Sequence, residues 1–330
     1  MDNRRVYRTI RMALKQLFPS EPKGNFARRL TTLAALVAGI VQARSCQLPA
    51  IARKTPDPAK ADSRIKRYSR WVQHEKVEPE AYYLPFVREL LAHLATIREL
   101  VFVIDGSEVG HACITLMISL IYGKRALPIT WLVVKGRKGH LSEQVHLTLL
   151  NQLHAILPTG ARMIFLGDGE FDGIALLSAL QHKGWRYVCR TAKNAKLFEE
   201  DLLFSFQDLC LQMDDFIHIP QVWFTQEGYG PVTVIATWER GYAHPLYLVT
   251  NIELPDEAVY WYKKRFQIET FFSDQKSRGF FLHKSHLSEP TRLSNLMIAA
   301  CLAYLWIVYL GCIAVRDHWV AIIHRADRCD

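Results

Sequence analysis

The stretch at residues 259–279, VYWYKKRFQIETFFSDQKSRG, places four polar side chains at regular intervals along one predicted helix. It contains no proline, and its only glycine is the last residue, so an α-helix of about five turns is predicted. At about 100° per residue, the four side chains share one stripe about 60° wide: Tyr262, Arg265, Glu269 and Lys276. The main apolar group faces a neighbouring direction: Trp261, Ile268, Phe271 and Phe272.

This stripe is compatible with two kinds of surface. A single glutamate between two cations suits a metal ion bound beside phosphate groups, because hard divalent cations prefer carboxylate oxygens. A solvent-exposed face with charge pairs at i,i+4 and i,i+7 spacing has the same sequence. The stripe alone does not separate these two possibilities.

Positive charge is concentrated in the first third of the 330-residue chain. Residues 1–100 contain 19 Lys and Arg against 9 Asp and Glu, whereas the remainder contains 22 against 23. This distribution indicates a polyanionic partner, either nucleic acid or an anionic membrane surface. The seven cysteines show no zinc-binding spacing, which favours reduced thiols in a cytosolic protein.

Residues 1–98 are predicted to form a helical region that binds DNA. Helices are expected at 26–43 and 48–53, and a third helix from residue 62 carries a basic cluster. Helix, turn and basic helix in this order suit docking on DNA, although a solvated basic face has the same pattern. The cluster contains Arg64, Lys66, Arg67, Arg70 and Trp71.

Two aspartates follow buried apolar strands in the middle of the sequence. Asp105 comes directly after the run LVFVI, and Asp168 follows the run MIFL by one glycine. If the two strands are neighbours, both carboxylates project from one edge of the sheet, where α/β folds place their sites. Each Asp-Gly pair, taken alone, is typical of a turn. Together with Glu269, the aspartates offer enough carboxylates to hold two hard divalent cations.

The segment 197–251 changes to short strands separated by glycine turns, which predicts a β-rich insertion before the polar stripe. Its expected strands are 216–219, 222–225, 232–238 and 246–250.

Residues 294–315, SNLMIAACLAYLWIVYLGCIAV, carry no charge. About 20 such residues span a bilayer, but a helix buried on all sides of a large core has the same composition. We expect this helix to pack against the predicted sheet, with hydrogen-bond partners or solvent for Asn295, Tyr304 and Tyr309. A membrane-anchored protein is the alternative.

The stripe has the spacing Tyr-x₂-Arg-x₃-Glu-x₆-Lys, which resembles the signature of the type-four insertion-sequence family of bacterial DDE transposases. The strand that ends in Asp105 and the segment Gly167-Asp168-Gly169-Glu170-Phe171 resemble the two aspartate motifs of that family. Members commonly have arginine where this chain has Gly169. The resemblance covers roughly residues 60–315.

The resemblance implies an α/β fold with an RNase H-like catalytic core, a β-rich insertion and an N-terminal helical DNA-binding region. The implied parts are 1–98 for DNA binding, 99–196 and 252–315 for the core, 197–251 for the insertion and 316–330 for a short tail. Relatives often carry a further C-terminal helix, so a truncated copy is one expectation.

By the same resemblance, Asp105, Asp168 and Glu269 form the catalytic triad and hold two Mg²⁺ ions, for which Mn²⁺ can substitute. The implied reaction is cleavage at both transposon ends, through a hairpin intermediate, followed by joining of the 3′ ends to target DNA. The implied partners are double-stranded DNA, as terminal repeats and target, and a second copy of the chain in a synaptic complex. The expected location is the cytoplasm, at the nucleoid of a bacterium, without a membrane.

The resemblance also assigns DNA contacts. Tyr262, Arg265 and Lys276 are expected to engage phosphates of the transposon end. Trp238 and Trp223 lie in the insertion and are candidates to stack on a flipped base, although a core position is the ordinary role of tryptophan. The alternatives are a metal-dependent DNA nuclease and an inactive DNA-binding protein derived from a transposase.

Overall fold

The structure is a computed structural model that describes residues 3–319 except 19, 137, 138, 140 and 201. The chain forms two compact units. The first, called the sheet unit, contains Val87–Glu108 and Ile114–Phe272. The second, called the helical unit, contains Met1–Phe86, Val109–Cys113 and Ser273–Asp330. The predicted core and tail segments therefore contribute to both units, and the tail beyond residue 319 lies outside the described residues.

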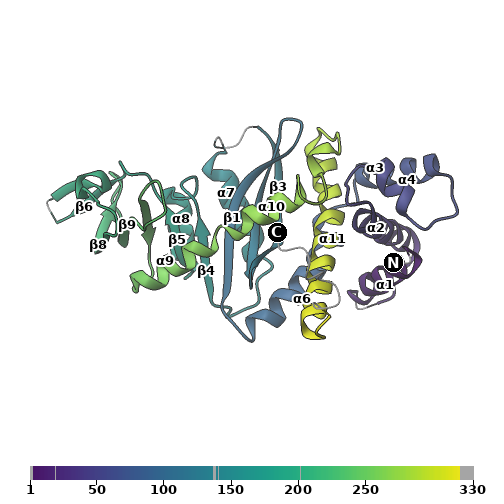
Figure 1. Cartoon of the computed structure of the whole chain (residues 1–330), viewed down its shortest axis with the longest axis horizontal. Helices are drawn as coiled ribbons and strands as arrows, with labels where there is room; N and C mark the ends of the chain where they lie inside the picture. The colour runs from purple at the N-terminus through teal and green to yellow at the C-terminus, as the bar shows by residue number, and fades with distance from the viewer. Residues whose placement is uncertain (1–2, 19, 137–138, 140, 201, 320–330) are drawn as a thin grey trace. The chain divides into compact units, whose positions relative to one another are not determined.

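The sheet unit is built on one sheet with the strand order β3-β2-β1-β4-β5-β10-β9-β8-β6-β7 in the described part of the chain (Figure 1). Strand β4 runs parallel to both β1 and β5. These strands read as continuous apolar runs because helices shield parallel strands from water. Their bounds are β1 Leu100–Gly110, β2 Cys113–Tyr122, β3 Arg125–Lys135, β4 Met163–Gly167 and β5 Arg186–Arg190.

The predicted β-rich insertion continues this sheet. Strand β10 pairs antiparallel with β5, and β9, β8, β6 and β7 follow in antiparallel order. The strands expected at 216–219 and 222–225 are one strand, β8, with an irregular register between Ile219 and Val222. The bounds are β6 Lys196–Glu199, β7 Leu202–Ser205, β8 Phe216–Phe224, β9 Tyr229–Thr237 and β10 Leu246–Thr250.

Helices complete the mixed α/β fold of the sheet unit. Helices α7 and α8 pack on each other and on β3 and β5, and α9 packs on β5. Figure 1 shows α9 and α10 crossing one face of the sheet. Leucines form the buried side of α8 because they recur at helical spacing. The bounds are α6 Leu84–Ala95, α7 Glu143–His154, α8 Ile174–His182, α9 Pro255–Lys264 and α10 Gln267–Gln275.

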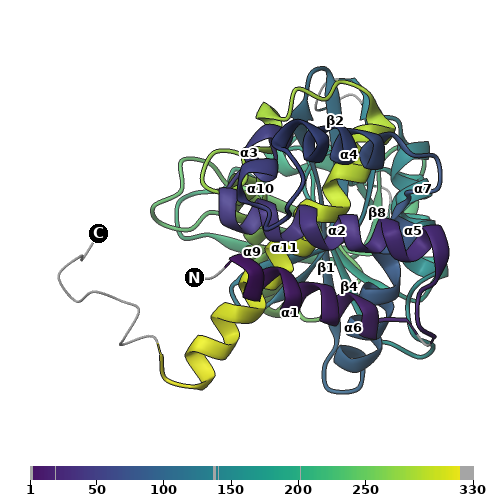
Figure 2. The same ribbon diagram turned by 90° about the vertical axis from the view of Figure 1, so that its right-hand side faces the viewer.

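The helical unit packs around α2 (Figure 2). Residues of α2 from Leu33 to Ile40 are buried, and Gly39 lets α3 approach closely, since an added Cβ would lie 2.5 Å from Ile51 Cγ2. The bounds in this unit are α1 Asn3–Gln16, α2 Gly24–Ala43, α3 Leu48–Lys54, α4 Ala61–Gln73, α5 Pro79–Tyr82 and α11 Pro290–Arg316.

The apolar segment 294–315 forms most of α11, but the prediction that it packs on the sheet is wrong for most of its length. Its main partners are α2 and α4, because the apolar face of α2 also needs cover. The side-chain amide of Asn295 donates to the carbonyl of Val72 at 3.0 Å, and Tyr309 is exposed. Both α2 and α11 are long and apolar enough to cross a membrane, and about half of each apolar window is buried within the protein.

Candidate active site

Asp105 and Asp168 occupy the same level of two neighbouring parallel strands. Residues that pair between β1 and β4 are 63 positions apart, as in Val103 with Leu166. Asp105 and Asp168 have the same separation, so the two carboxylates start from adjacent points of the sheet. Asp105 was expected to follow its strand, but β1 continues through it to Gly110.

The helix predicted over 259–279 is broken at Arg265 and Phe266, between α9 and α10. Backbone N–H groups at the break donate to carbonyls three residues back rather than four: Arg265 to Tyr262 at 2.9 Å, Ile268 to Arg265 at 3.1 Å, and Glu269 to Phe266 at 3.2 Å. This 3₁₀ geometry tightens the turn and changes the direction of the side chains that follow. Sequence pattern missed the break because no proline or glycine marks it.

The guanidinium of Arg265 lies close to two of the three predicted carboxylates, those of Glu269 and Asp105. Its Nη2 donates to Oε1 of Glu269 at 2.9 Å, and its Nη1 lies 4.0 Å from Oδ2 of Asp105. Asp168 acts on the same guanidinium through its charge. Burial works to lower the pKa of Arg265, but Tyr262 and the three carboxylates raise it above its ordinary value. The structure thus brings the carboxylates of Asp105 and Glu269, 164 residues apart in the sequence, to one cation.

The four stripe residues differ in exposure, which argues against a solvated charged face. Tyr262 is 1% exposed and Arg265 is 6% exposed, whereas the side chain of Glu269 is 53% exposed. Burial raises the pKa of Tyr262. Lys276 comes directly after α10, is half-buried and belongs to the helical unit.

The two tryptophans of the insertion occupy different positions in the sheet unit. Trp223 lies on β8, five strands from β1 in the sheet order, which at about 4.8 Å per strand is roughly 24 Å. Its side chain is exposed. Trp238 follows β9, is half-buried and donates from Nε1 to the carbonyl of Tyr242 at 3.0 Å. Neither the exposure of Trp223 nor the hydrogen bond of Trp238 distinguishes base stacking from a structural role.

A second group of titratable side chains next to Asp168 was missed from the sequence. His146 on α7 is 4% exposed, and its Nε2 lies 3.9 Å from Oε1 of Glu170. Burial lowers the pKa of His146. Burial also raises the pKa of Asp172, and the charges of Asp168 and Glu143 raise it further. The acidic density of DGEFD is the signal in the sequence that points to this group.

Helix α7 also fixes the loop that follows Asp168. Oε1 of Glu143 accepts a hydrogen bond from the backbone N–H of Leu176 in the first turn of α8, at 3.0 Å. A side chain at Gly173 would displace this carboxylate, because an added Cβ would lie 2.4 Å from the same oxygen. The position of Asp168 therefore depends on α7 as well as on β4.

The predicted basic cluster of α4 is divided by the structure. Arg64 and Arg67 are held by the loop before the helix, where Arg67 donates to the carboxylate of Asp57 at 2.7 Å. Trp71 is buried, so its side chain is not on a surface that DNA could contact. The exposed cations of the cluster are Lys66 and Arg70.

The donor set of the three carboxylates fits a hard divalent cation in chemistry. Among the described residues, no three His, Cys, Asp or Glu side chains lie close enough together to hold one ion. In this structure the carboxylates of Asp105 and Glu269 face the guanidinium of Arg265 instead.

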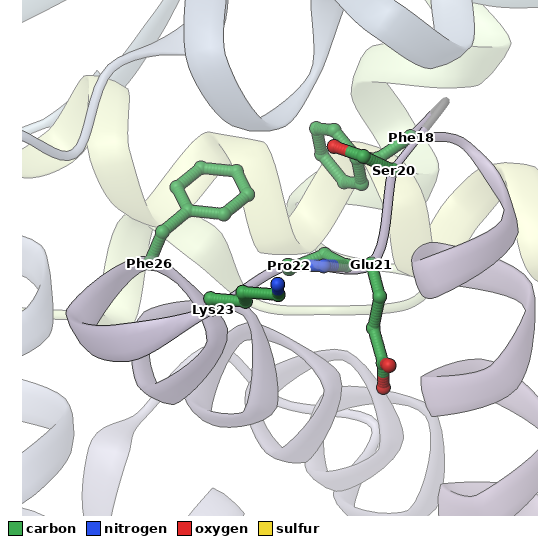
Figure 3. A pocket seen from close by; sticks show the side chains of 6 residues that line it. All are labelled: Phe18, Ser20, Glu21, Pro22, Lys23 and Phe26. Carbon is green, nitrogen blue, oxygen red and sulfur yellow. The ribbon is translucent and has the colours of Figure 1, made fainter.

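An open pocket of about 600 Å³ lies in the helical unit, between α1 and α2 (Figure 3). Its lining includes the edge-to-face pair Phe18 and Phe26, whose ring centroids are 5.2 Å apart. The pocket contains none of the candidate residues, so its size does not make it the active site.

Comparison with known protein families identifies the family of this chain. The profile of the family described as transposase DDE domain matches residues 98–306. The chain belongs to this family. The matched segment contains all six residues of the predicted triad and phosphate contacts: Asp105, Asp168, Tyr262, Arg265, Glu269 and Lys276. No curated protein sequence matches the chain.

The solved structure of piggyBac transposase has a fold similar to that of this chain. The cryo-EM structure of the piggyBac transposase synaptic complex with hairpin DNA has a TM-score of 0.50 at 12% identity, covering 96% of this chain and 73% of that one. Two crystal structures of human endonuclease V have TM-scores of 0.32 and 0.29, at 15% and 13% identity. They cover 59% and 70% of this chain and 98% and 94% of theirs. The likeness of fold therefore rests on piggyBac transposase.

Proposed function

We propose that the protein is a DNA transposase with an RNase H-like core, which cuts DNA at the ends of its element and joins the cut strands to target DNA. The observation that carries the proposal is the placement of Asp105 and Glu269 at Arg265, with Asp168 directly after the strand that pairs with the strand of Asp105, within the segment that matches the family. The fold of piggyBac transposase, solved in a synaptic complex with hairpin DNA, supports a duplex DNA partner and two cooperating copies of the chain. The proposed location is the bacterial cytoplasm, at the nucleoid.

The proposed roles follow from charge and position. Asp105, Asp168 and Glu269 would hold two divalent cations, with Mg²⁺ as the physiological ion. Bound there, the ions would lower the pKa of an attacking water or 3′-hydroxyl and neutralise the leaving oxygen. Arg265 and Lys276 would bind phosphates and orient the strand, since charged donors form the strongest hydrogen bonds to phosphate.

One observation favours a second candidate. Glu269 is half-exposed and paired with Arg265 instead of with the two aspartates, as expected for an inactive DNA-binding protein derived from a transposase. A metal-dependent nuclease is the third candidate, because it needs the same carboxylates but forms no joined product.

The test is a Glu269→Gln substitution assayed on a duplex that carries the inverted repeats flanking the coding region. Glutamine keeps the shape of the side chain and removes its charge. We expect Mg²⁺-dependent cleavage to be abolished and binding to the duplex to be retained or slightly tightened, because one repulsion with phosphate is removed. Strand-transfer products on a target plasmid separate a transposase from a nuclease.

Glu253→Gln provides a matched control, because Glu253 is an exposed glutamate of the same unit outside the candidate site. It should cleave and join DNA as the wild type does. An active Glu269→Gln protein contradicts the assignment of the triad. A wild-type protein that binds the repeats but never cuts them supports the inactive candidate.

A further inference from the structure

The environment of Arg265 is unusual for a purely structural arginine. Arg186 in the same unit shows the structural pattern, because its guanidinium donates to Glu99 and to Glu257. Arg265 is more deeply buried, and it donates a short side-chain hydrogen bond to Glu269 while also interacting with the hydroxyl of Tyr262. Its Nε has no hydrogen-bond partner among the described residues.

The remaining contacts of Arg265 are with charge and with rings. Asp105 lies at 4.0 Å, beyond hydrogen-bond distance, and Asp168 acts only through its field. The guanidinium also lies 4.7 Å from the ring centroid of Phe266 and 5.8 Å from that of Tyr262. The guanidinium is therefore held largely by charge, and a second cation would compete with it for the same carboxylates.

We propose that Arg265 is an internal counter-ion that holds the carboxylates of Asp105 and Glu269 together and competes with the divalent cation for Glu269. This inference rests on the proposed function, because it takes the carboxylates as the cation ligands. Without a bound cation, the positive charge of Arg265 offsets the repulsion among the carboxylates. When a divalent cation binds, Glu269 must exchange the Nη2 hydrogen bond of Arg265 for the metal.

The exchange gives Arg265 a second position. Its guanidinium is released from the carboxylates and becomes free to bind a DNA phosphate, which the buried position in this structure does not allow. Cation binding and DNA binding are then coupled through one side chain: each favours the state that the other needs. Arg265 is thus a positioning residue for the carboxylates and a ligand for the substrate in turn.

The first test measures Mn²⁺ binding to the protein without DNA, by titration calorimetry. Arg265→Gln removes the competing charge, so Mn²⁺ should bind more tightly than in the wild type, by about 10- to 100-fold, the size of one charge-assisted hydrogen bond. Arg265→Lys keeps the charge and should remain close to the wild type. The midpoint of thermal unfolding of Arg265→Gln without metal should fall below that of the wild type, because the carboxylates lose their counter-ion.

Arg186→Gln is the control for loss of an arginine that pairs with two carboxylates of the same unit. It should lower thermal stability without changing the affinity for Mn²⁺, since Glu99 and Glu257 are not among the proposed ligands. If Arg265→Gln binds Mn²⁺ no more tightly than the wild type, competition by Arg265 is disproved.

A second measurement uses the wild-type protein and is independent of how well the variants fold. Phenylglyoxal modifies accessible guanidinium groups, and mass spectrometry of the peptides reports each arginine separately. Arg265 should be protected without metal and labelled several-fold faster once Mn²⁺ is added, whereas the labelling of Arg186 should not change. Unchanged labelling of Arg265, or no binding of Mn²⁺ by either the wild type or Arg265→Gln, overturns the proposal.

Neither measurement contains DNA, so its outcome is separate from that of the cleavage assay. A wild-type protein that cuts and joins DNA while Arg265 stays protected in Mn²⁺ would leave the transposase function in place and remove only the counter-ion role.

Discussion

Lys276 is the member of the polar stripe whose proposed role can be tested without disturbing the carboxylates. We expect Lys276→Ala to weaken binding to the repeat-carrying duplex by about 10- to 100-fold, because a charge-assisted hydrogen bond to phosphate is lost. Arg278→Ala, two residues further on at an exposed position, should change binding by a much smaller factor. Gel-shift titrations at one salt concentration measure the DNA affinity of both variants. Equal losses of affinity would mean that Lys276 makes no specific contact with a phosphate.

His146 makes a prediction about pH. Burial lowers its pKa below the ordinary value of about 6.5, so the unfolded chain binds the proton more readily than the folded chain does. The free energy of unfolding should therefore decrease as the pH falls from about 6.5 toward the lower folded-state pKa, by at most about 1.4 kcal/mol per pH unit from this residue.

His146→Gln should remove that part of the pH dependence, measured by urea unfolding at a series of pH values between 7.5 and 5. His218→Gln is the control, because His218 is exposed. Carboxylates near His146 also titrate at the acid end, so the comparison is between variants and not between pH values. Identical pH profiles for wild type and His146→Gln would show that the buried imidazole is not the group responsible.

At the residue scale, the sequence was informative where one side chain has one chemical preference. Carboxylates after apolar strands pointed to Asp105 and Asp168, and in the structure Asp105 lies on β1 and Asp168 directly follows β4, the strand paired with β1. His146 and Asp172 could not be found in this way, because their altered pKa values arise from burial and from neighbours far along the chain. The effect of the three carboxylates on the pKa of Arg265 likewise arises only in the folded chain.

At the scale of elements, periodicity predicted strands better than it predicted helix ends. The strand expected at 246–250 has those bounds in the structure, since an apolar run between turn residues has few alternatives. The break between α9 and α10 had no local signal. It depends on the tertiary burial of Arg265, which lies at the turn where the 3₁₀ hydrogen bonds occur.

For helix α11, too, the sequence pattern predicted the element but not the elements on which it packs. Its apolar composition correctly predicted a helix but not what covers it, because a sheet and another apolar helix bury such a surface equally well. The partner is decided by α2, which is itself apolar over its second half and lies more than 200 residues earlier in the chain.

At the scale of the whole molecule, the excess of positive charge over residues 1–100 belongs mostly to the helical unit, and α11 belongs to that unit as well. A fragment of residues 1–98 would lack α11 and expose the apolar face of α2, so the DNA-binding prediction is best tested on the full chain. Because α2 packs on α11, the N-terminal region and the C-terminal helix belong to one compact unit.

The last prediction concerns the salt dependence of DNA binding by that full chain. Each phosphate neutralised releases counterions, so log K should fall against log salt with a slope of about 0.9 per contact. Lys66 and Arg70 are the exposed cations of α4, and their double alanine variant should reduce the slope by about 1.8 on a duplex of arbitrary sequence. Lys193→Ala with Lys196→Ala removes two exposed lysines of the sheet unit as the control. Equal reductions in the two variants would show that DNA binding does not depend on the concentration of charge in the first third of the chain.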